Sequence, residues 1–466
     1  MMMLLPSPLF FDRMNLIYDA PDEVRRWYDR PHGRGMRINP LKLSPGRIAE
    51  MGFELEPVPF SPLGYRLTND EQRPGKSPWH HAGAIYMQEP SAMSAVTALD
   101  PQPGERILDM CAAPGGKSTQ IAALLNRSGI LFANEYVRSR ANILVSNIER
   151  MGIPNAVVTS LHPDAIAQRF PGWFDRVLVD APCSGEGMFR REEAAVAEWS
   201  PEHVRTCAAR QRGILDSAAQ CVAEGGVLVY STCTFAPEEN ELTVAAFLSE
   251  HPDFYIEAID AGFGRPGLDA DRLKAFAAAH GQDISGIAIP DSITLTRRIF
   301  PSDGGEGHFV ARLRKSGTLQ PHDDEFSCTE SHSGPAAGLL ESCFDTPLNG
   351  WLHQQGDSHY LLPCPMELLS GLPVVRAGVL VGTAEKKRIE PHHALFMAAD
   401  PASCRNRLEL SADSRELERF LHGEQIDAPD DLRGYTVVLC SGIITGFGKA
   451  SGGALKNRYP KGLRLL

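Results

Sequence analysis

The sequence predicts an α/β fold: a doubly wound, Rossmann-like central domain between a small N-terminal domain and a C-terminal α+β module. Strand and helix patterns alternate over residues 96–315, which is typical of a parallel sheet with helices on both faces. A polar segment rich in Ser, Gly and Pro follows at 316–347 and is expected to be a linker. The length of 466 residues leaves room for about three domains, each able to bury its own core.

The N-terminal domain is expected to cover residues 1–95, with helical patterns at 21–28 and 45–51. Beyond the linker, residues 348–466 combine β-like runs at 374–382 and 435–448 with one helical pattern at 415–423. We therefore expect a small α+β module there, which ends in a basic tail.

The central domain is expected to contain six strands and four helices. The strands are predicted at 106–110, 130–134, 156–159, 176–180, 227–232 and 308–313, and the helices at 117–125, 138–151, 201–222 and 238–250. Ligands of a doubly wound sheet bind at the carboxyl ends of its strands, so candidate site residues are sought at those positions.

The stretch 105–135 contains the first candidate site. A buried strand leads into the turn at 111–117, then a helix, then a second strand that is closed by Glu135. Turn glycines let a ligand approach the backbone closely, and an acid one strand later can hydrogen-bond ribose hydroxyls. The turn matches neither the phosphate-loop pattern nor the dinucleotide pattern, which disfavours a pyrophosphate. S-adenosylmethionine, which has a ribose and no phosphate, is the expected ligand, and an ordinary strand-to-helix turn is the alternative.

Two further strand ends carry cysteines. One β pattern ends in Asp180 and continues to Cys183, and another ends directly before Cys233. A free cysteine is most often a small buried hydrophobe. Both cysteines nevertheless follow the expected carboxyl ends of parallel strands, on the face where the first turn would bind its nucleoside. Two cysteines and an aspartate that converge there favour covalent chemistry over simple packing.

Composition and charge restrict the partners. The ten cysteines include no C-x-x-C pair, so no metal is expected, and we expect reduced thiols in a cytoplasmic protein. No apolar run reaches membrane-spanning length. The net charge of −12 argues against a nucleic-acid partner, yet basic residues gather at 25–47 and 449–466. Each basic stretch either binds a polyanion or is a solvated face.

With these motifs in view, the chain resembles the RNA cytosine-C5 methyltransferases of the Nop2/Sun type. The resemblance rests on RINPLK, YMQEPSAM, DMCAAPGGKST, DAPCSGEGMFRR, STCTFAPEENE and RIFPSDGGEGHFVARL, which are distributed over nearly the whole chain. The segments EPHHALFMAAD and GFGKASGGALKNRYPKGLR are similar to the bacterial RsmF-like subgroup, which methylates small-subunit (16S) ribosomal RNA. The resemblance implies a class I methyltransferase domain and a PUA-like C-terminal module, and it makes both flanking domains candidates for RNA binding.

The two cysteines have a chemical rationale in such a reaction. Cytosine C5 is a poor nucleophile, so a thiolate adds to C6 and activates C5 for attack on the sulfonium methyl group. The resemblance assigns this role to Cys233 and product release to Cys183. It leads us to expect that Asp180 hydrogen-bonds the cytosine ring, with N3 protonated as C6 is attacked. Lys117 either assists there or closes the turn structurally.

The resemblance also implies a set of cofactor contacts. Glu135 is expected to bind the ribose, and Asp180 lies close enough to belong to both sites. An aspartate near the adenine is common in related enzymes, and here either Asp164 or His162 occupies that position. The methionine end is expected to be held by Cys111, Ala112, Ala113, Pro114, Gly115, Gly116 and Lys117.

Other functions remain open from the sequence. An amino-group methyltransferase is disfavoured because the strand end reads DAPC, without the amide of an Asn-Pro-Pro-aromatic motif. A catalytically idle RNA-binding or ribosome-assembly factor would use the fold as a platform. A tRNA cytosine-C5 methyltransferase is a further alternative. The expected partner is ribosomal RNA or the small ribosomal subunit, bound by a monomer without membrane or metal.

Overall fold

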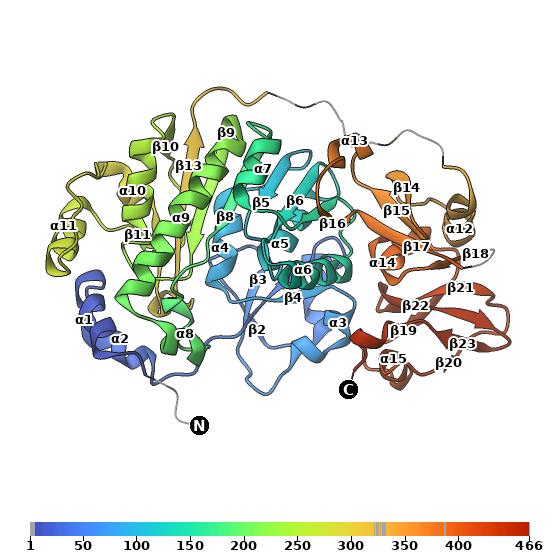
Figure 1. Ribbon diagram of the computed structural model, residues 1–466. Coiled ribbons are helices and arrows are strands. Elements are labelled where there is room, and N and C mark those ends of the chain that lie inside the picture. The colour runs from blue at the N-terminus through green and yellow to red at the C-terminus, as the bar shows by residue number, and fades with distance from the viewer. Residues whose placement is uncertain are drawn as a thin grey trace.

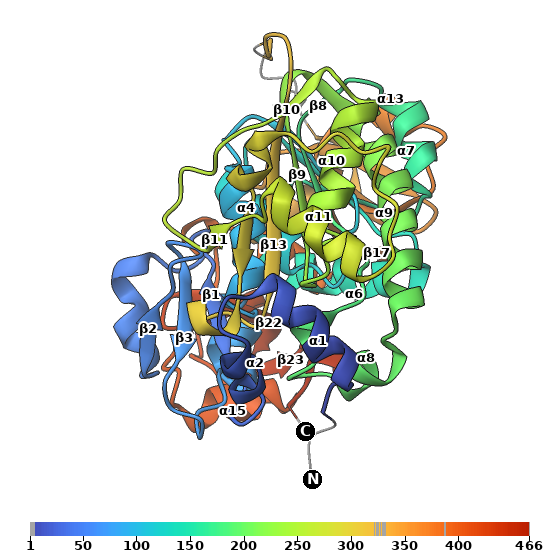
Figure 2. The same cartoon turned by 90° about the vertical axis from the view of Figure 1, so that its left-hand side faces the viewer.

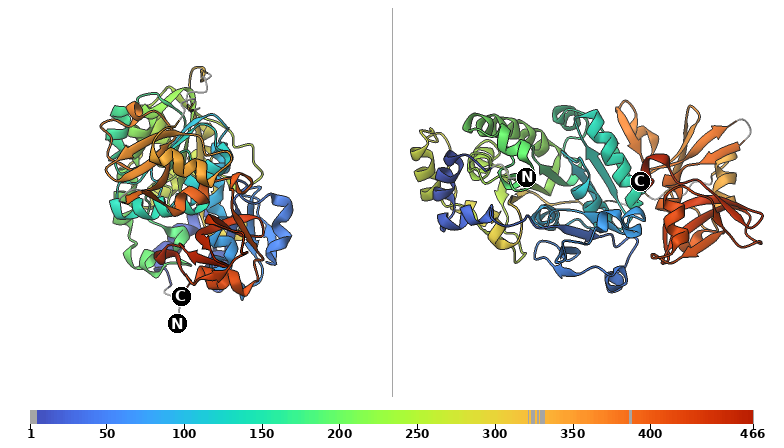
Figure 3. Two further views of the ribbon diagram at one scale, coloured as in Figure 1. Left: turned by 90° about the vertical axis from the view of Figure 1, so that its right-hand side faces the viewer. Right: turned by 90° about the horizontal axis from the view of Figure 1, so that it is seen from below.

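The computed structural model describes residues 5–320, 322, 326, 328, 332–385 and 388–465. Figure 1 shows the central α/β domain, with the N-terminal segment, in blue, along its lower side and the C-terminal segment, in orange and red, at its right-hand end. The N-terminal sheet lies beneath the central domain, and the C-terminal segment stands at one end of the molecule as two small sheets (Figure 3).

The central sheet has five parallel strands in the order β7–β6–β5–β8–β9. From β5 the chain winds outward through β6 and β7, and it then returns to the other side of β5 for β8 and β9. The direction of winding therefore changes between β5 and β8, which is where doubly wound sheets bind their ligands. The strands span Arg106–Asp109 (β5), Ile130–Asn134 (β6), Ala156–Thr159 (β7), Phe174–Asp180 (β8) and Val222–Thr232 (β9).

Helices cover both faces of this sheet (Figure 1). Successive strand residues face opposite sides, so Ile107 packs towards one helix layer and Leu108 towards the other. One layer consists of α4 (Ser94–Leu99), α5 (Gly116–Leu125) and α6 (Arg138–Met151). The other consists of α7 (Pro163–Arg169), α9 (Pro201–Cys221), α10 (Glu241–Glu250) and α11 (Ala270–Ala279), and the short α8 (Glu193–Glu198) precedes α9.

The sheet is mixed, which corrects the expectation that it is wholly parallel. β13 (His308–Lys315) runs antiparallel to β9, and β10 (Phe254–Ile256), β12 (Arg297–Ile299) and β11 (Arg265–Pro266) extend that side antiparallel. A buried apolar run reveals a strand but not its direction. Here only a short connection joins β12 to β13, which suits an antiparallel pair, because a parallel pair needs a longer crossover.

At the opposite edge, a strand from the C-terminal region joins the central sheet. β16 (Val374–Ala377) pairs antiparallel with β7, and Val374 lies opposite Thr159. The segment expected to be a linker also holds structure, since α12 (Pro335–Cys343) buries Ala336 and Leu340 in a C-terminal core. Residues 321, 323–325, 327 and 329–331 of that segment lie outside the described residues.

The N-terminal segment forms a helical pair and a four-stranded sheet. α1 (Pro8–Ile17) and α2 (Pro21–Trp27) contribute Phe10 and Trp27 to an aromatic cluster that includes Phe189 and Phe300 of the central domain. Figure 2 shows this helical pair against α8 and α11. The sheet has the order β2–β3–β1–β4, with strands Leu55–Pro57, Gly64–Leu67, Gly35–Ile38 and Ile85–Met87; a 3-10 helix occupies Pro45–Met51, and α3 is Pro78–His81.

The C-terminal segment has two further sheets. The first has the order β14–β15–β17–β18, with strands Trp351–Gln355, Ser358–Leu362, Val379–Glu385 and Arg388–Pro391. The second has the order β19–β21–β22–β23–β20, with strands Arg407–Leu410, Gly434–Cys440, Ile443–Ser451, Ala454–Asn457 and Ile426–Asp427. Their helices are α13 (Met366–Leu369), α14 (His393–Ala398) and α15 (Arg415–Leu421). Among the helices described, none combines the length and apolar character needed to cross a bilayer.

Candidate active site

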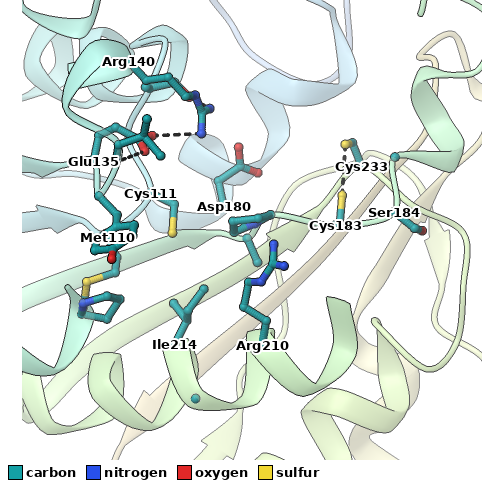
Figure 4. Close-up of a pocket in the computed structure, with 18 of the residues that line it drawn as sticks. Met110, Cys111, Glu135, Arg140, Asp180, Cys183, Ser184, Arg210, Ile214 and Cys233 are labelled. Atoms are coloured by element: carbon teal, nitrogen blue, oxygen red, sulfur yellow. Dashed lines mark hydrogen bonds and ion pairs between the residues drawn. The ribbon is translucent and has the colours of Figure 1, made fainter. Parts of the chain in front are cut away.

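A cavity of about 990 Å³ opens at the carboxyl ends of β5, β6 and β8. It lies where the winding direction of the sheet changes, and Figure 4 shows side chains from four elements turned towards it. Met110 and Cys111 follow β5, Glu135 follows β6, and Asp180 closes β8. The floor is completed by Ile214 and Arg210 of α9.

The two candidate thiols meet at one end of this cavity (Figure 4). The Sγ atoms of Cys183 and Cys233 lie 3.2 Å apart. Their positions follow from the sheet, because β8 and β9 are parallel neighbours and Asp180 pairs with Ser231 in register. The hydrogen bond to Cys233, together with burial, raises the pKa of the Cys183 thiol well above its usual value. Two thiols so close do not both ionise, so the pair can hold one thiolate beside one thiol.

Asp180 is held in a charged hydrogen-bond network beside the thiols. Its Oδ2 accepts from Lys117 Nζ at 2.7 Å, and its Oδ1 accepts from Ser231 Oγ at 2.8 Å. Burial raises the pKa of Asp180, but the charge of Lys117 and these hydrogen bonds outweigh it and lower the pKa overall. Asp180 is therefore a carboxylate at neutral pH. The Lys117 ammonium stays charged for the same reason, because Asp180 offsets the effect of its burial on the pKa.

His308 is a site residue that the sequence patterns do not identify. It begins β13, and its Nε2 lies 3.8 Å from Asp180 Oδ1 without a hydrogen-bond partner among the described residues. Burial and the nearby Lys117 lower its pKa to about 3, so its ring is neutral. The strand pairing explains its position: Phe309 lies opposite Thr232, which brings His308 to the same sheet end as Cys233.

The glycine-rich turn contributes to the cavity with only part of its length. Cys111 and Ala113 line the cavity, whereas Ala112, Pro114, Gly115, Gly116 and Lys117 are not among its lining residues. Gly115 has φ = 114° and an added Cβ would lie 3.0 Å from Leu144, so this position requires glycine. Asp109 anchors the turn: it is buried, accepts from Ser118 Oγ at 2.6 Å, and burial raises its pKa to about 7.

Glu135 faces the cavity from the end of β6. Its carboxylate accepts a hydrogen bond from Val137 N at 2.9 Å and is 3.2 Å from Arg140 Nη1. These contacts orient the carboxylate at the cavity wall (Figure 4). Tyr136, which follows it, also lines the cavity, and its side chain is largely exposed.

Both candidates for the adenine contact lie on the cavity wall. His162 Nδ1 is 3.4 Å from Asp164 Oδ2, and both side chains are well exposed. Asp164 is already engaged through Oδ1, which accepts from Ser217 Oγ at 2.6 Å. The structure therefore brings both residues to the same wall.

One face of α9 supplies cavity residues that the motifs do not include. His203, Arg210 and Ile214 recur at helical spacing along this face. Arg210 points into the cavity beneath Asp180 (Figure 4). Across the described ranges, no group of three or more His, Cys, Asp or Glu side chains is arranged to hold a metal ion.

The doubly wound sheet and the nucleoside-sized cavity at its strand ends define a class I methyltransferase fold. Comparisons with known proteins identify the family. Residues 96–314 match the model for 16S rRNA methyltransferase RsmB/F, and residues 5–90 match the N-terminal domain of 16S rRNA methyltransferase RsmF. Residues 340–398 match the RsmF rRNA methyltransferase first C-terminal domain, and residues 406–465 match the methyltransferase RsmF PUA domain. The chain belongs to the RsmF family of 16S rRNA methyltransferases.

Individual relatives agree with this assignment. The ribosomal RNA small subunit methyltransferase F of Klebsiella pneumoniae is 35% identical over 460 residues, which cover 93% of this chain and 91% of the relative. The protein of the same name from Aeromonas hydrophila is 34% identical over 458 residues, with 93% and 91% covered.

Two solved structures share the fold of the central part. A methyltransferase homolog protein from Pyrococcus horikoshii is 30% identical, with a TM-score of 0.57, and the match covers 66% of this chain and 95% of that chain. NSun6 from Pyrococcus horikoshii is 21% identical, with a TM-score of 0.53 and coverage of 66% and 98%, and shows the fold alone.

Proposed function

We propose that this protein transfers a methyl group from S-adenosylmethionine to C5 of a cytidine in 16S ribosomal RNA, through a covalent bond between Cys233 and C6 of the base. The observation that carries the proposal is the pair of thiols 3.2 Å apart beside the Asp180 carboxylate. A thiolate next to a thiol suits a reaction that needs one sulfur to form a bond and another to help break it.

The residues at the strand ends fit S-adenosylmethionine. A cavity of about 990 Å³ accommodates a nucleoside and an amino acid, and its turn has no phosphate-binding loop. Glu135 would hold the ribose hydroxyls, Cys111 and Ala113 the methionine end, and Asp164 or His162 the adenine side. The bound cofactor supplies an electrophilic methyl group at its sulfonium.

Cys233 would begin the reaction. Its thiolate adds to C6 of the cytosine, and the electrons of the C5–C6 bond become available at C5. C5 then takes the methyl group, and S-adenosylhomocysteine is the leaving group. Lys117 supports this assignment because its ammonium group lies within electrostatic reach of Cys233. Asp180 would hydrogen-bond the ring at N3: the Lys117 ammonium, 2.7 Å from Asp180, can pass a proton to N3 as C6 is attacked and take it back when Cys233 leaves.

Cys183 would complete the reaction. Once Cys233 is bonded to C6, its sulfur is a neutral thioether, so a charged Cys233 no longer raises the pKa of Cys183. After its own proton has passed to solvent, Cys183 takes the C5 proton, and the electrons of the C5–H bond reform the C5–C6 double bond and expel the Cys233 thiolate. With their sulfurs 3.2 Å apart, both cysteines would reach the same base.

The flanking segments would position the RNA. Domain boundaries near residues 95, 315 and 347 would give an N-terminal and a C-terminal module on either side of the catalytic sheet, each with a basic stretch. These modules would account for ribosomal RNA binding by a chain whose net charge is −12.

The proposal is tested with 16S ribosomal RNA that carries tritium at cytidine C5. Wild-type protein with cofactor should release tritium, and Cys233→Ala should abolish release while cofactor binding persists, because the thiol lies at the opposite end of the cavity from Glu135 (Figure 4). Cys328→Ala, which changes a cysteine outside the cavity lining, is the matched control. Wild-type turnover in Cys233→Ala would remove the nucleophile assignment. Absence of tritium release from wild type would indicate an RNA-binding factor instead, and preferential release from tRNA would indicate a tRNA enzyme.

A further inference from the structure

Two buried polar side chains from other elements hydrogen-bond the backbone on either side of Cys183. Gln211 Nε2, from α9, donates to the carbonyl oxygen of Pro182 at 3.0 Å. Glu239, in the turn before α10, accepts through Oε2 from the backbone N–H of Ser184 at 3.0 Å. The residues immediately before and after Cys183 are therefore each fixed by a side chain that does not belong to the cysteine loop.

These two side chains also hold each other. Gln211 Nε2 donates to Glu239 Oε2 at 2.8 Å, so both amide hydrogens of Gln211 are used. The Tyr230 hydroxyl donates to the carbonyl oxygen of Glu239 at 2.6 Å and lies 3.0 Å from Gln211 Oε1. Gln211, Glu239 and Tyr230 are all 0% exposed. A fully buried network of this kind fixes one geometry, because the loss of any bond would leave a polar group without water or partner.

Stability alone does not explain why polar side chains occupy these two core positions. Gln211 interrupts the apolar stripe of α9, between Ala208 and Leu215, where a hydrophobic side chain would fill the core. Glu239 Oε1 has no hydrogen-bond partner among the described residues, which is unfavourable for a buried carboxyl oxygen. Burial raises the pKa of Glu239 to about 8, so the group is a neutral acid at pH 7. The two residues are thus buried polar groups whose side chains hydrogen-bond the backbone on either side of Cys183.

We propose that Gln211 and Glu239 are positioning residues for Cys183: they clamp the Pro182 carbonyl and the Ser184 amide so that the Cys183 sulfur stays at the base bonded to Cys233. The inference rests on the proposed function, because it assigns the clamp to the release step. Bond formation by Cys233 does not need the clamp, since Cys233 is carried by the end of β9. Loss of the clamp should therefore slow release and spare attack.

The test compares Gln211→Met and Glu239→Met with Cys183→Ala. Methionine keeps the length of each side chain and removes its hydrogen bonds. Each variant is incubated with cofactor and 16S ribosomal RNA, and two quantities are measured: methylation in the first turnover, and the fraction of protein that remains attached to RNA in denaturant. We expect first-turnover methylation close to wild type, together with release slowed on the order of 10- to 100-fold, the range for a displaced catalytic group. The attached fraction should rise accordingly, as in Cys183→Ala.

Three further variants distinguish positioning from folding. Glu239→Gln keeps an oxygen acceptor and is neutral like the native acid, so it should restore release relative to Glu239→Met. Tyr230→Phe, which removes only the outer hydroxyl, should slow release in the same direction but by less. Asn155→Leu is the matched control: Asn155 is 6% exposed and donates to the Gly129 carbonyl at 3.2 Å, on the β7 side of the sheet. It should lower stability without raising the attached fraction.

The outcomes separate the two proposals. If Cys183→Ala accumulates attached protein while Gln211→Met and Glu239→Met lose methylation and attachment in parallel, like a destabilised protein, the clamp is refuted and the proposed function stands. If both clamp variants release product at the wild-type rate, the clamp is refuted as well. If Cys183→Ala itself accumulates no attached protein, the release role of Cys183 is wrong, and the clamp falls with it.

Discussion

Replacing Lys117 by Met tests the electrostatics of the site. Lys117 Nζ lies 2.7 Å from Asp180 Oδ2, and their side chains are 11% and 30% exposed. Two unit charges about 4 Å apart attract by about 4 kcal/mol at an effective dielectric constant of 20, and loss of one partner of a fully buried pair costs about 3–5 kcal/mol. Asp180 is partly exposed and keeps its bond to Ser231, so we expect a loss of about 2 kcal/mol in the free energy of unfolding at pH 7.

The loss of stability in Lys117→Met is expected to depend on pH. In the wild type, the folded pKa of Asp180 is below its unfolded value, so its stabilisation is present above the unfolded pKa and is lost as pH falls through the folded one. Without Lys117, burial dominates and raises the pKa of Asp180, so an ionised Asp180 destabilises the variant. The deficit relative to wild type should therefore be largest at neutral pH and shrink towards pH 4.

Urea unfolding at pH 7 and pH 4.5 measures this deficit, with Lys117→Met/Asp180→Asn as the compensating variant. The double variant should recover most of the loss at pH 7, because no uncompensated charge remains. Lys117→Met and the double variant Lys117→Met/Asp180→Asn should both lose methyl transfer. The reasoning would be refuted by a deficit of equal size at both pH values, or by a double variant less stable than Lys117→Met alone.

The remaining predictions concern the cofactor, the RNA and three buried histidines. Glu135→Ala should weaken cofactor binding by about 1.5–3 kcal/mol, the range for hydrogen bonds to a charged group, with RNA affinity unchanged; calorimetry with equal cofactor affinity would contradict it. Neutralising the basic tail should weaken RNA binding and reduce the slope of log affinity against log salt by about 0.7–0.9 for each phosphate that the tail no longer neutralises, and an unchanged slope would make the tail structural. The tail residues are Lys449, Lys456, Arg458 and Lys461. Because Arg458 Nη2 pairs with Glu390 Oε1 at 3.0 Å, a variant that changes only the three lysines isolates the effect on RNA binding. Finally, burial lowers the pKa of His80 to about 3, of His392 to about 4 and of His393 to about 3, so each should cost about 1.4 kcal/mol of stability per pH unit as pH falls below about 6.5. Thermal unfolding that is unchanged between pH 7 and pH 5 would disprove this.

The sequence predicts the parallel core of the fold well because each element there is locally encoded. The helix at Arg138–Met151 buries Leu144, Ile148 and Met151 at helical spacing, so its pattern alone defines it. Each of the strands β5 to β9 contains a run of buried apolar residues, because both faces of the sheet are covered. Their order then places Asp180, Cys183 and Cys233 at one sheet end.

The features that could not be predicted depend on pairings between distant segments. The direction of β13 and the partner of β16 are set by tertiary contacts, because the β pattern at 374–382 predicts a strand but carries no signal of what that strand pairs with. His308 and Gln211 became site residues only through such contacts. The sequence does hold a sign of Gln211, because it is a polar residue on the apolar stripe of α9. The sequence holds no such sign of His308, because its neighbour Asp180 is more than one hundred positions away in the chain.

The antiparallel pairing of β16 with β7 bears on how this protein can be divided. A fragment that ended after β13 would expose the backbone donors and acceptors of β7 along an open sheet edge, and such edges recruit other strands and lead to aggregation. The catalytic sheet is therefore completed by a segment that follows it in the chain by more than fifty residues. A truncated enzyme is expected to need a capped or charged β7 edge to remain monodisperse. β16 also leads along the chain directly into β17, so backbone hydrogen bonds join the first C-terminal sheet's segment to β7, the strand next to the one that precedes Glu135.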